Sequence, residues 1–267
     1  MSPVLGIDHV LAGVADLEAA RAAWRRLGFT VTPRGRHIGW GTGNYCIMFP
    51  DDYVELLGIV DPAGDLQGLD RLLAKREGLL GLALASRDAG AVHAALQSAG
   101  LAAGPPADLS RLLEAPEGTV EPAFKLVHPS DPEQHFGFKT FVCQHLTPEL
   151  VWRREWIDHP NGATGILAVT AATPKAAAVA PAYRALLGDD AVIEDAAGLS
   201  VLLGGAILRL AETNDISGLI GMAVAVSNLE RARRMLVGGG VTFEADGDGL
   251  HIDPDDASGV ALSLVER

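Results

Sequence analysis

The chain has 267 residues, of which 48% are hydrophobic, and a formal net charge of −13. This length accommodates two domains of ordinary size, each with a buried core. Because nucleic acids and anionic membrane surfaces attract clustered Lys and Arg, the acidic balance argues against both as partners. The apolar runs are far shorter than the roughly 20 residues that span a bilayer. Cys46 and Cys143 are the two cysteines, and no secretory signal is visible, so we expect a cytoplasmic protein without a disulfide scaffold.

One structural unit recurs along the chain: an apolar strand, a polar residue, an Ala-rich helix that ends near Gly, and then short strands. The four units open at residues 7–20, 79–92, 163–176 and 219–232. A gapless alignment places one residue of each unit at the start of its helix: Asp16, Asp88, Ala172 and Asn228. Asp and Asn there are expected N-caps, because their side-chain oxygen accepts a hydrogen bond from a free backbone N–H. Pro181 interrupts the third helical pattern, so we expect that helix to start late or to kink.

After each helix the apolar period changes from about 3.6 residues to 2, which is typical of β-strands. The order βαβββ is therefore predicted four times, which indicates an α+β fold. We divide the chain into residues 1–146 and 162–267, with two units in each half. The connector, residues 147–161, is polar and flanked by proline, as a join between two halves often is.

His9 and Glu55 are unusual because they lie in apolar, strand-like runs, IDHV and YVELL. A buried carboxylate requires a metal, a cation or a proton, so Glu55 is the harder of the two to explain as a core residue. Strand alternation predicts that His9 shares its face with Ile7 and Leu11. Imidazole nitrogen and carboxylate oxygen together suit Zn, Fe, Ni, Mn or Co, so the ligand types leave the metal open.

A βαβββ unit with His in its first strand and Glu in its last resembles the vicinal oxygen chelate superfamily. The run GRHIGWGTGNYCIMFPDDYVELLGI is especially similar to the glyoxalase-like branch, as is TFVCQHLTPELVWRREWIDHPNGA. The resemblance implies that the units pair into half-open barrels around a divalent metal, which holds two neighbouring substrate oxygens and stabilises an enediolate or similar anion. Glyoxalases, extradiol dioxygenases, epimerases and metal-free drug-binding proteins share this fold, so the fold alone selects none of them.

The resemblance further implies that His9 and Glu55 are metal ligands and that the second unit supplies the others. The residue aligned with His9 is Gly81, which has no donor atom. The second carboxylate position best matches Gln144, and His145 follows on the opposite strand face. Strand alternation lets one of these two point inward, and the choice between them stays open. A metal-bound Glu55 that detaches would also be the catalytic base.

His37, Thr42 and Asn44 are the candidate substrate-binding residues. They lie in GRHIGWGTGNY, where four glycines let the chain bend or approach a ligand closely. The alternative is a bulged hairpin whose polar groups satisfy the local backbone. His159 and Asn161, in DHPNGA, are interpreted first as turn residues and second as the rim of a pocket.

The corresponding positions of the second half are Gly165, Arg209, Gly221 and Ser263. These residues cannot hold a metal together, so we place the functional pocket in residues 1–146 and predict no catalytic centre in residues 162–267. The leading hypothesis is a metal-dependent glyoxalase-like lyase, isomerase or dioxygenase acting on a small molecule with adjacent oxygens. The alternative is a metal-free small-molecule binding protein of the bleomycin-resistance type. A homodimer is left open.

Overall fold

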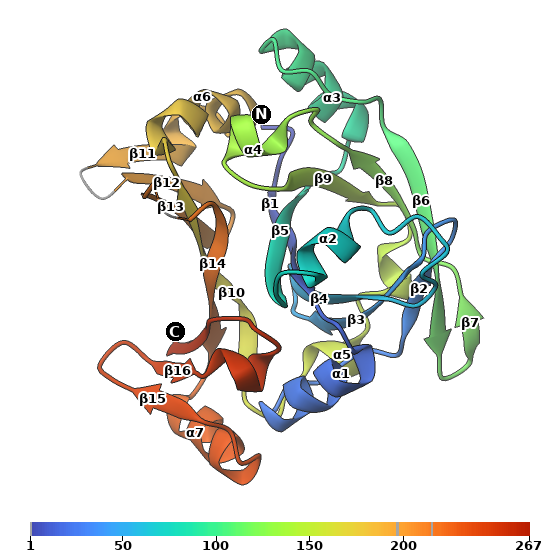
Figure 1. Ribbon diagram of the computed structural model, residues 1–267, viewed down its shortest axis with the longest axis vertical. Coiled ribbons are helices and arrows are strands. Elements are labelled where there is room, and N and C mark those ends of the chain that lie inside the picture. The colour runs from blue at the N-terminus through green and yellow to red at the C-terminus, as the bar shows by residue number, and fades with distance from the viewer. Residues whose placement is uncertain (1, 196–197, 215) are drawn as a thin grey trace.

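In the computed structural model, the chain forms two curved sheets that lie side by side (Figure 1). The structure describes residues 2–195, 198–214 and 216–267, so four residues of the predicted halves lie outside the described part. The elements of the first unit are β1 (Gly6–Gly13), α1 (Leu17–Arg26), β2 (Gly35–His37), β3 (Thr42–Met48) and β4 (Tyr53–Ile59). After the short α2 (Leu69–Leu73), the second unit contains β5 (Gly78–Ala85), α3 (Ala89–Ser98), β6 (Ala107–Ala115), β7 (Gly118–Val120), β8 (Ala123–Val127), α4 (Pro132–Phe136) and β9 (Thr140–His145).

The connector forms one turn of 3₁₀-helix (Pro148–Leu150) and α5 (Arg154–Ile157). The third unit contains β10 (Ala163–Thr173), α6 (Ala176–Leu187), β11 (Val192–Asp195), β12 (Gly198–Leu203) and β13 (Ala206–Glu212). The fourth unit contains β14 (Gly218–Val226), α7 (Leu229–Gly238), β15 (Phe243–Ala245), β16 (Leu250–Ile252) and β17 (Leu262–Glu266). The predicted α+β fold of repeated βαβββ units is confirmed. None of the described helices is long and apolar enough to cross a membrane.

Three helices begin directly after the residues that the alignment of the repeats places at their starts. Asp16, Asp88 and Asn228 each accept a hydrogen bond from a backbone N–H in the first turn of α1, α3 and α7, which confirms them as N-caps. The third helix, α6, starts later than its aligned residue, Ala172, because β10 continues through that residue. Helix α6 contains Pro181. The expected late start is confirmed, but Pro181 does not cause it, because this residue lies inside α6.

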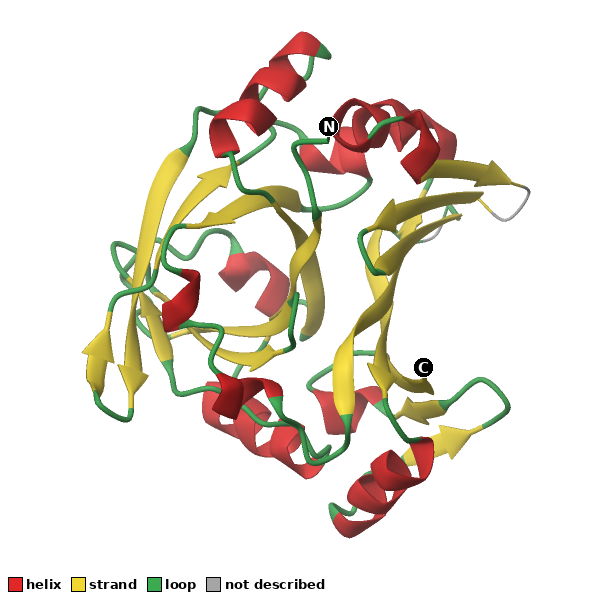
Figure 2. Ribbon diagram, turned by 180° about the vertical axis from the view of Figure 1, so that it is seen from behind, coloured by secondary structure: helices red, strands yellow, loops and turns green. Residues whose placement is uncertain are grey.

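The first sheet closes into a barrel, whereas the described part of the second sheet stays open (Figure 2). The first strand order is β2-β3-β4-β1-β5-β9-β8-β6-β7, and β2 also pairs with β6. In that closing ladder Gly35 faces Leu113 and His37 faces Arg111. The second order is β11-β12-β13-β10-β14-β17-β16-β15. The half-open barrel expected for residues 1–146 is thus a closed one, because β2 bridges β3 and β6.

The main apolar core lies outside the barrel and is shared by both halves. A single cluster of buried side chains runs from Val4 to Leu264 and includes residues of both sheets and of the helices against them. A second cluster lies within the barrel and includes Leu11, Phe124 and Phe141. Several residues of this second cluster also line a cavity inside the barrel.

The connector is fastened to the first unit by His159 and Asn161, which are almost fully buried. Nε2 of His159 donates to the carbonyl of Met48 at 2.9 Å, and its Nδ1 accepts from the N–H of Thr30 at 3.0 Å. Nδ2 of Asn161 donates to the carbonyl of Leu27 at 3.0 Å. Both side chains therefore hold the chain in place, and neither lines the barrel cavity.

Candidate functional site

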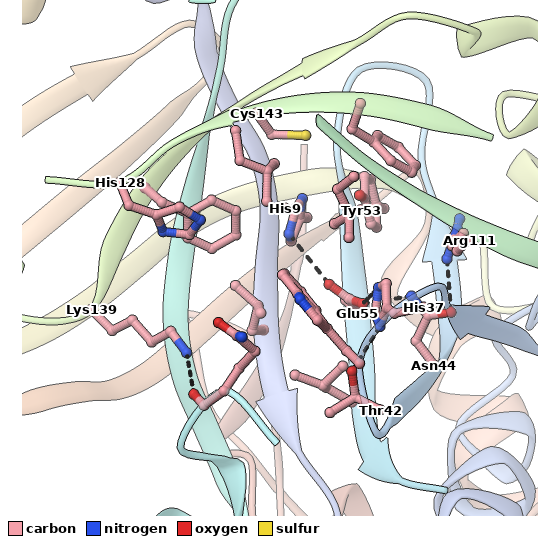
Figure 3. Close-up of a pocket in the computed structure, with 18 residues that line it drawn as sticks. His9, His37, Thr42, Asn44, Tyr53, Glu55, Arg111, His128, Lys139 and Cys143 are labelled. Atoms are coloured by element: carbon pink, nitrogen blue, oxygen red, sulfur yellow. Dashed lines mark hydrogen bonds and ion pairs between the residues drawn. The ribbon is translucent and has the colours of Figure 1, made fainter. Parts of the chain in front are cut away.

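A cavity of about 250 Å³ lies inside the barrel and is slightly smaller than typical small-molecule sites (Figure 3). Its polar lining includes His9, His37, Thr42, Asn44, Glu55 and Arg111. Its apolar lining includes Leu11, Leu57, Leu109, Phe124, Leu126 and Phe141. The polar side chains come mostly from β1 to β4, and β8 and β9 supply much of the apolar wall. The structure thus brings together the site residues predicted in the first unit.

A bulge in β1 turns both Asp8 and His9 toward the barrel interior. The ladder with β5 pairs Ile7 with Leu84 and His9 with Ala83, so Asp8 is the extra residue between them. Ile7 packs in the outer core, whereas His9 lines the cavity. The prediction that Ile7 shares the face of His9 is wrong, because simple alternation fails where a bulge inserts a residue.

His9 lies between two buried carboxylates. Its Nδ1 is 2.6 Å from Oδ1 of Asp8, and its Nε2 is 3.3 Å from Oε2 of Glu55. Burial alone would raise the pKa of Asp8, but His145 and His9 outweigh it and hold this pKa well below its usual range. An anionic Asp8 accepts a hydrogen bond from the Nδ1–H of His9 and so orients the ring with Nε2 toward Glu55 and the cavity.

Glu55 is the centre of the polar side. Its Oε1 accepts a hydrogen bond from Nδ2 of Asn44 at 2.5 Å and lies 3.7 Å from Nε2 of His37. Burial opposes ionisation of Glu55, but His9, the hydrogen bond from Asn44 and the charge of Arg111 lower its pKa below the ordinary value, so the carboxylate is ionised at neutral pH. Nδ1 of His37 lies 2.9 Å from Oγ1 of Thr42. Burial lowers the pKa of His37 to about 4, so this imidazole is neutral at the same pH.

Arg111 enters the site because β6 pairs with β2. Its Nη1 donates to Oδ1 of Asn44 at 2.8 Å and to Sγ of Cys46 at 3.3 Å. Since Oδ1 of Asn44 is taken by Arg111, the amide nitrogen of Asn44 is the group that faces Glu55. Sequence reasoning missed Arg111, because nothing in the run ADLSRLLEA foretells that β6 closes the barrel.

Strand β9 resolves the choice between Gln144 and His145. Oε1 of Gln144 accepts a hydrogen bond from the N–H of Ala89 at 2.9 Å, so this side chain meets α3 on the outside of the barrel. Nε2 of His145 lies 3.2 Å from Oδ1 of Asp8, on the inside. His145 is therefore the inward residue, and it lies behind His9 rather than beside Glu55.

The parallel ladders identify the second-unit counterpart of Glu55. Strand β4 places Glu55 opposite Leu11 of β1, and β9 places Phe141 opposite Ala83 of β5. In the aligned repeat Leu11 corresponds to Ala83, so Phe141 and not Gln144 corresponds to Glu55. The second unit thus has a phenyl ring where the first has a carboxylate.

A second group of donor atoms lies behind His9. Among the described residues, Asp8, Cys143 and His145 form a set whose ligand atoms all lie within 4.8 Å of one another. Burial raises the pKa of the Cys143 thiol well above its usual value, so the thiol is protonated at neutral pH. Asp8 belongs to both groups and connects them.

The second sheet carries an open groove that is separate from the barrel cavity. Its lining includes Arg209, Gly221, His251 and Ser263. Gly165 lies elsewhere, close to the carboxylate of Asp52. The groove brings three of the four second-half positions together, and Asp248 also lines it. The absence of a catalytic centre there stays a prediction.

A closed barrel of βαβββ units with a His–Glu pair on the first and last strands of one unit defines a glyoxalase/dioxygenase-type protein. Residues 7–187 match the model of a family described as glyoxalase-like domain, and the chain belongs to that family. The resemblance to the vicinal oxygen chelate superfamily is thereby confirmed.

Several solved structures are similar over essentially the whole chain. A hypothetical protein from Staphylococcus aureus has a TM-score of 0.73 at 14% identity, covering 98% of this chain and 99% of that one. A mutant 4-hydroxymandelate synthase from Streptomyces coelicolor has a TM-score of 0.61 at 15% identity, covering 100% and 93%. A fusion of a xylose isomerase-like TIM barrel with 4-hydroxyphenylpyruvate dioxygenase has a TM-score of 0.57 at 16% identity, covering 100% and 49%. At these identities the likeness shows the fold alone, and no curated protein matches the sequence.

Proposed function

We propose that the protein is a metal-dependent enzyme of the glyoxalase/dioxygenase type that acts on a small molecule in the barrel cavity. The observation that carries the proposal is the convergence of Nε2 of His9 and the Glu55 carboxylate, 3.3 Å apart and buried. Two ligands of one metal ion, at bond lengths of about 2.1 Å, lie about 3.0 to 3.4 Å from each other.

His9 and His37 are prepared as ligands in the same way. Each has its Nδ1 in contact with a protein oxygen, of Asp8 or Thr42, and its Nε2 on the side of Glu55. Metal-bound His commonly has such an outer partner on its far nitrogen. Two imidazoles and one carboxylate are the donor set of non-haem Fe(II) oxygenases and also suit Zn, Ni, Mn or Co. His9 and Glu55 are therefore the pair that would hold the ion. His37 would complete the donor set, in place of a purely substrate-binding role, only after its ring moves closer, because its Nε2 lies 3.7 Å from Glu55 and the described donor set with all atoms within 4.8 Å of one another is a different one, Asp8, Cys143 and His145.

A divalent ion at this position would act as a Lewis acid on a substrate oxygen. The protein itself keeps Glu55 ionised and oriented, because Arg111 fixes Asn44 and Asn44 donates to the carboxylate. The lowered pKa of Glu55 favours the role of ligand over that of general base, since an effective base has a pKa near the working pH.

The metal-free binding protein is the second candidate. It is favoured by the second unit, which has Gly81 and Phe141 where the first has His9 and Glu55. It is also favoured by the largely apolar wall that β8 and β9 supply. Such a cavity would bind a small molecule by burial alone.

Metal content decides between the two candidates. Protein purified without a His-tag and reconstituted with Zn, Ni, Mn or Fe should contain about one ion per chain on elemental analysis, one for the His9–Glu55 pair. His9→Ala and Glu55→Gln should lose most of it. His251→Ala removes an imidazole from the second half and should keep the metal. A wild-type chain that takes up none of these ions, or equal loss in His251→Ala, would end the enzyme proposal in its metal-dependent form.

A further inference from the structure

We infer that the cavity binds a small aryl or alkyl carboxylate whose anionic group is held by Nζ of Lys139. The apolar body would lie against Phe124 and Phe141, with the far end toward His9 and Glu55. The inference names the substrate class of the proposed function and rests on it only for the reacting end. Binding of the anionic end requires no metal.

Lys139 is a cation in the cavity wall that forms no ion pair with a described residue. Its Nζ contacts the main-chain carbonyl of Gln67 at 3.4 Å, which is long for a hydrogen bond. The side chain is half-buried, and this burial lowers its pKa. An ammonium group has three donors, so most of the hydrogen-bonding capacity of Lys139 is available to a ligand. An anion at this point would offset the cost of removing the charge from water.

The opening beside Lys139 is locally basic. A groove that adjoins the cavity shares Gln67, His128, Lys139 and Phe141 with it. Among the residues that line this groove, the charged ones are Arg71, Lys75, Arg76, Lys139 and Glu133. Four basic residues against one acidic residue reverse the sign of a chain whose net charge is −13. A local positive field of this kind attracts anions to the mouth of the cavity.

The carbonyl that contacts Lys139 belongs to a residue in an unfavourable conformation. Gln67 has φ of +52° and precedes Gly68, which has φ of +78°. The Asp65 carboxylate holds Gln67 there by accepting from its backbone N–H at 3.0 Å and from its Nε2 at 2.6 Å. Left-handed backbone at a non-glycine residue persists only where surrounding contacts impose it, and it is common at ligand sites. The loop thus presents a fixed acceptor that positions the Lys139 amine at the cavity wall.

The rest of the cavity selects against other ligand classes. Figure 3 shows Lys139 on the side of the cavity away from Arg111 and Asn44, with Glu55 between them. A ligand with a cationic group at the mouth of the cavity would meet the charge of Lys139. A sugar would leave hydroxyl groups against the phenyl rings of Phe124 and Phe141 without partners. A molecule with one anionic end and an apolar body would pair its charge with Lys139 and pack its body against Phe124 and Phe141.

The test compares matched probes on the full chain, phenylpropionate against phenylpropanol and octanoate against octanol, with binding measured by titration calorimetry or ligand-observed NMR. Wild type should bind each carboxylate about 10- to 100-fold more tightly than its alcohol, the range of a charge-assisted hydrogen bond. Lys139→Gln should abolish this preference, so that acid and alcohol bind about equally. Lys139→Arg should keep most of it. Lys125→Gln is the control, because Lys125 is paired with Asp108 on the surface at 2.6 Å and should leave binding unchanged.

Several results would overturn the inference. They are equal binding of acid and alcohol by wild type, no binding of either pair, or an undiminished preference in Lys139→Gln. If Lys139→Gln fails to fold, the salt dependence of wild type decides, because the preference should fall as salt screens the charge. His9→Ala separates this inference from the proposed function: it should lose metal and keep the carboxylate preference. If wild type takes up metal normally but binds acid and alcohol equally, the carboxylate inference is refuted and the proposed function is not.

Discussion

Replacing Asp52 by Asn should stabilise the folded chain above pH 7, and the reason lies at the contact between the two sheets. Asp52 is in the turn between β3 and β4, and its Oδ1 accepts a hydrogen bond from the N–H of Ile166 in β10 at 3.1 Å. Burial raises the pKa of Asp52 to about 7, although this hydrogen bond opposes the effect. The folded chain therefore holds a proton that the unfolded chain has released.

The sign and size follow from the two pKa values. Below the ordinary value of 3.8 both states are protonated, and the contribution of the neutral carboxyl to stability is fully present. Between pH 3.8 and about 7 the unfolded chain binds fewer protons, so the free energy of unfolding falls as the pH rises. At about 1.4 kcal/mol per pH unit, this window corresponds to at most about 4 kcal/mol. Because Asp52 is only half-buried, water screens part of the effect, and we expect about 2 kcal/mol.

Urea unfolding at pH 5 and pH 8 measures the effect. Asn keeps the oxygen that accepts from Ile166 and has no charge. About two of the three pH units of the window lie between pH 5 and pH 7, so Asp52→Asn should lose about 1 kcal/mol less stability than wild type between the two pH values. Asp51→Asn alters the exposed neighbour in the same turn and serves as the control. Equal pH dependence in wild type and Asp52→Asn, or a variant less stable than wild type at pH 8, would refute the reasoning.

Two further substitutions test the site and its support. Asp8→Asn removes the negative charge from the partner of His9 Nδ1, so metal affinity measured by chelator competition should fall about 10- to 100-fold while the fold persists; an unchanged affinity would show that Asp8 does not orient His9. Asn161→Ala leaves the carbonyl of Leu27 and the N–H of Ala163 without their partner, so the free energy of unfolding should fall by about 2 to 4 kcal/mol at unchanged metal content. A loss of metal in Asn161→Ala at full stability would instead assign this residue to the site.

Much of the fold could be predicted from the sequence because its determinants are local. The N-caps Asp16, Asp88 and Asn228 act within one helical turn, and the change of period from helix to strand is visible within each unit. The closing ladder could not be predicted, because β2 has three residues and its partner in β6 lies far along the chain. Without that ladder, nothing connects Arg111 with Asn44.

The site residues show the same limit. His9 and Glu55 stand out because a charged group in an apolar strand needs a partner wherever it folds. The choice of Gln144 as the counterpart of Glu55 was wrong, because the register of β9 is set by its pairing with β5 and by no feature of its own sequence. Asp8 was overlooked because strand alternation places it on the other face of β1 from His9. Only the bulge turns both side chains toward the same side.

Closure of the barrel bears on the proposed metal site, because it brings a third donor of the first unit to the side of Glu55. The second unit has Gly81 and Phe141 at the ligand positions, so a half-open barrel would offer His9 and Glu55 alone. Pairing of β2 with β6 holds His37 against the cavity, where its Nε2 lies 3.7 Å from Glu55. The phenyl and aliphatic wall from the second unit keeps water away from these three groups, and interactions between charges strengthen where water is excluded. In the proposed function, the apolar wall of the second unit would therefore strengthen the interactions among His9, His37 and Glu55 of the first unit.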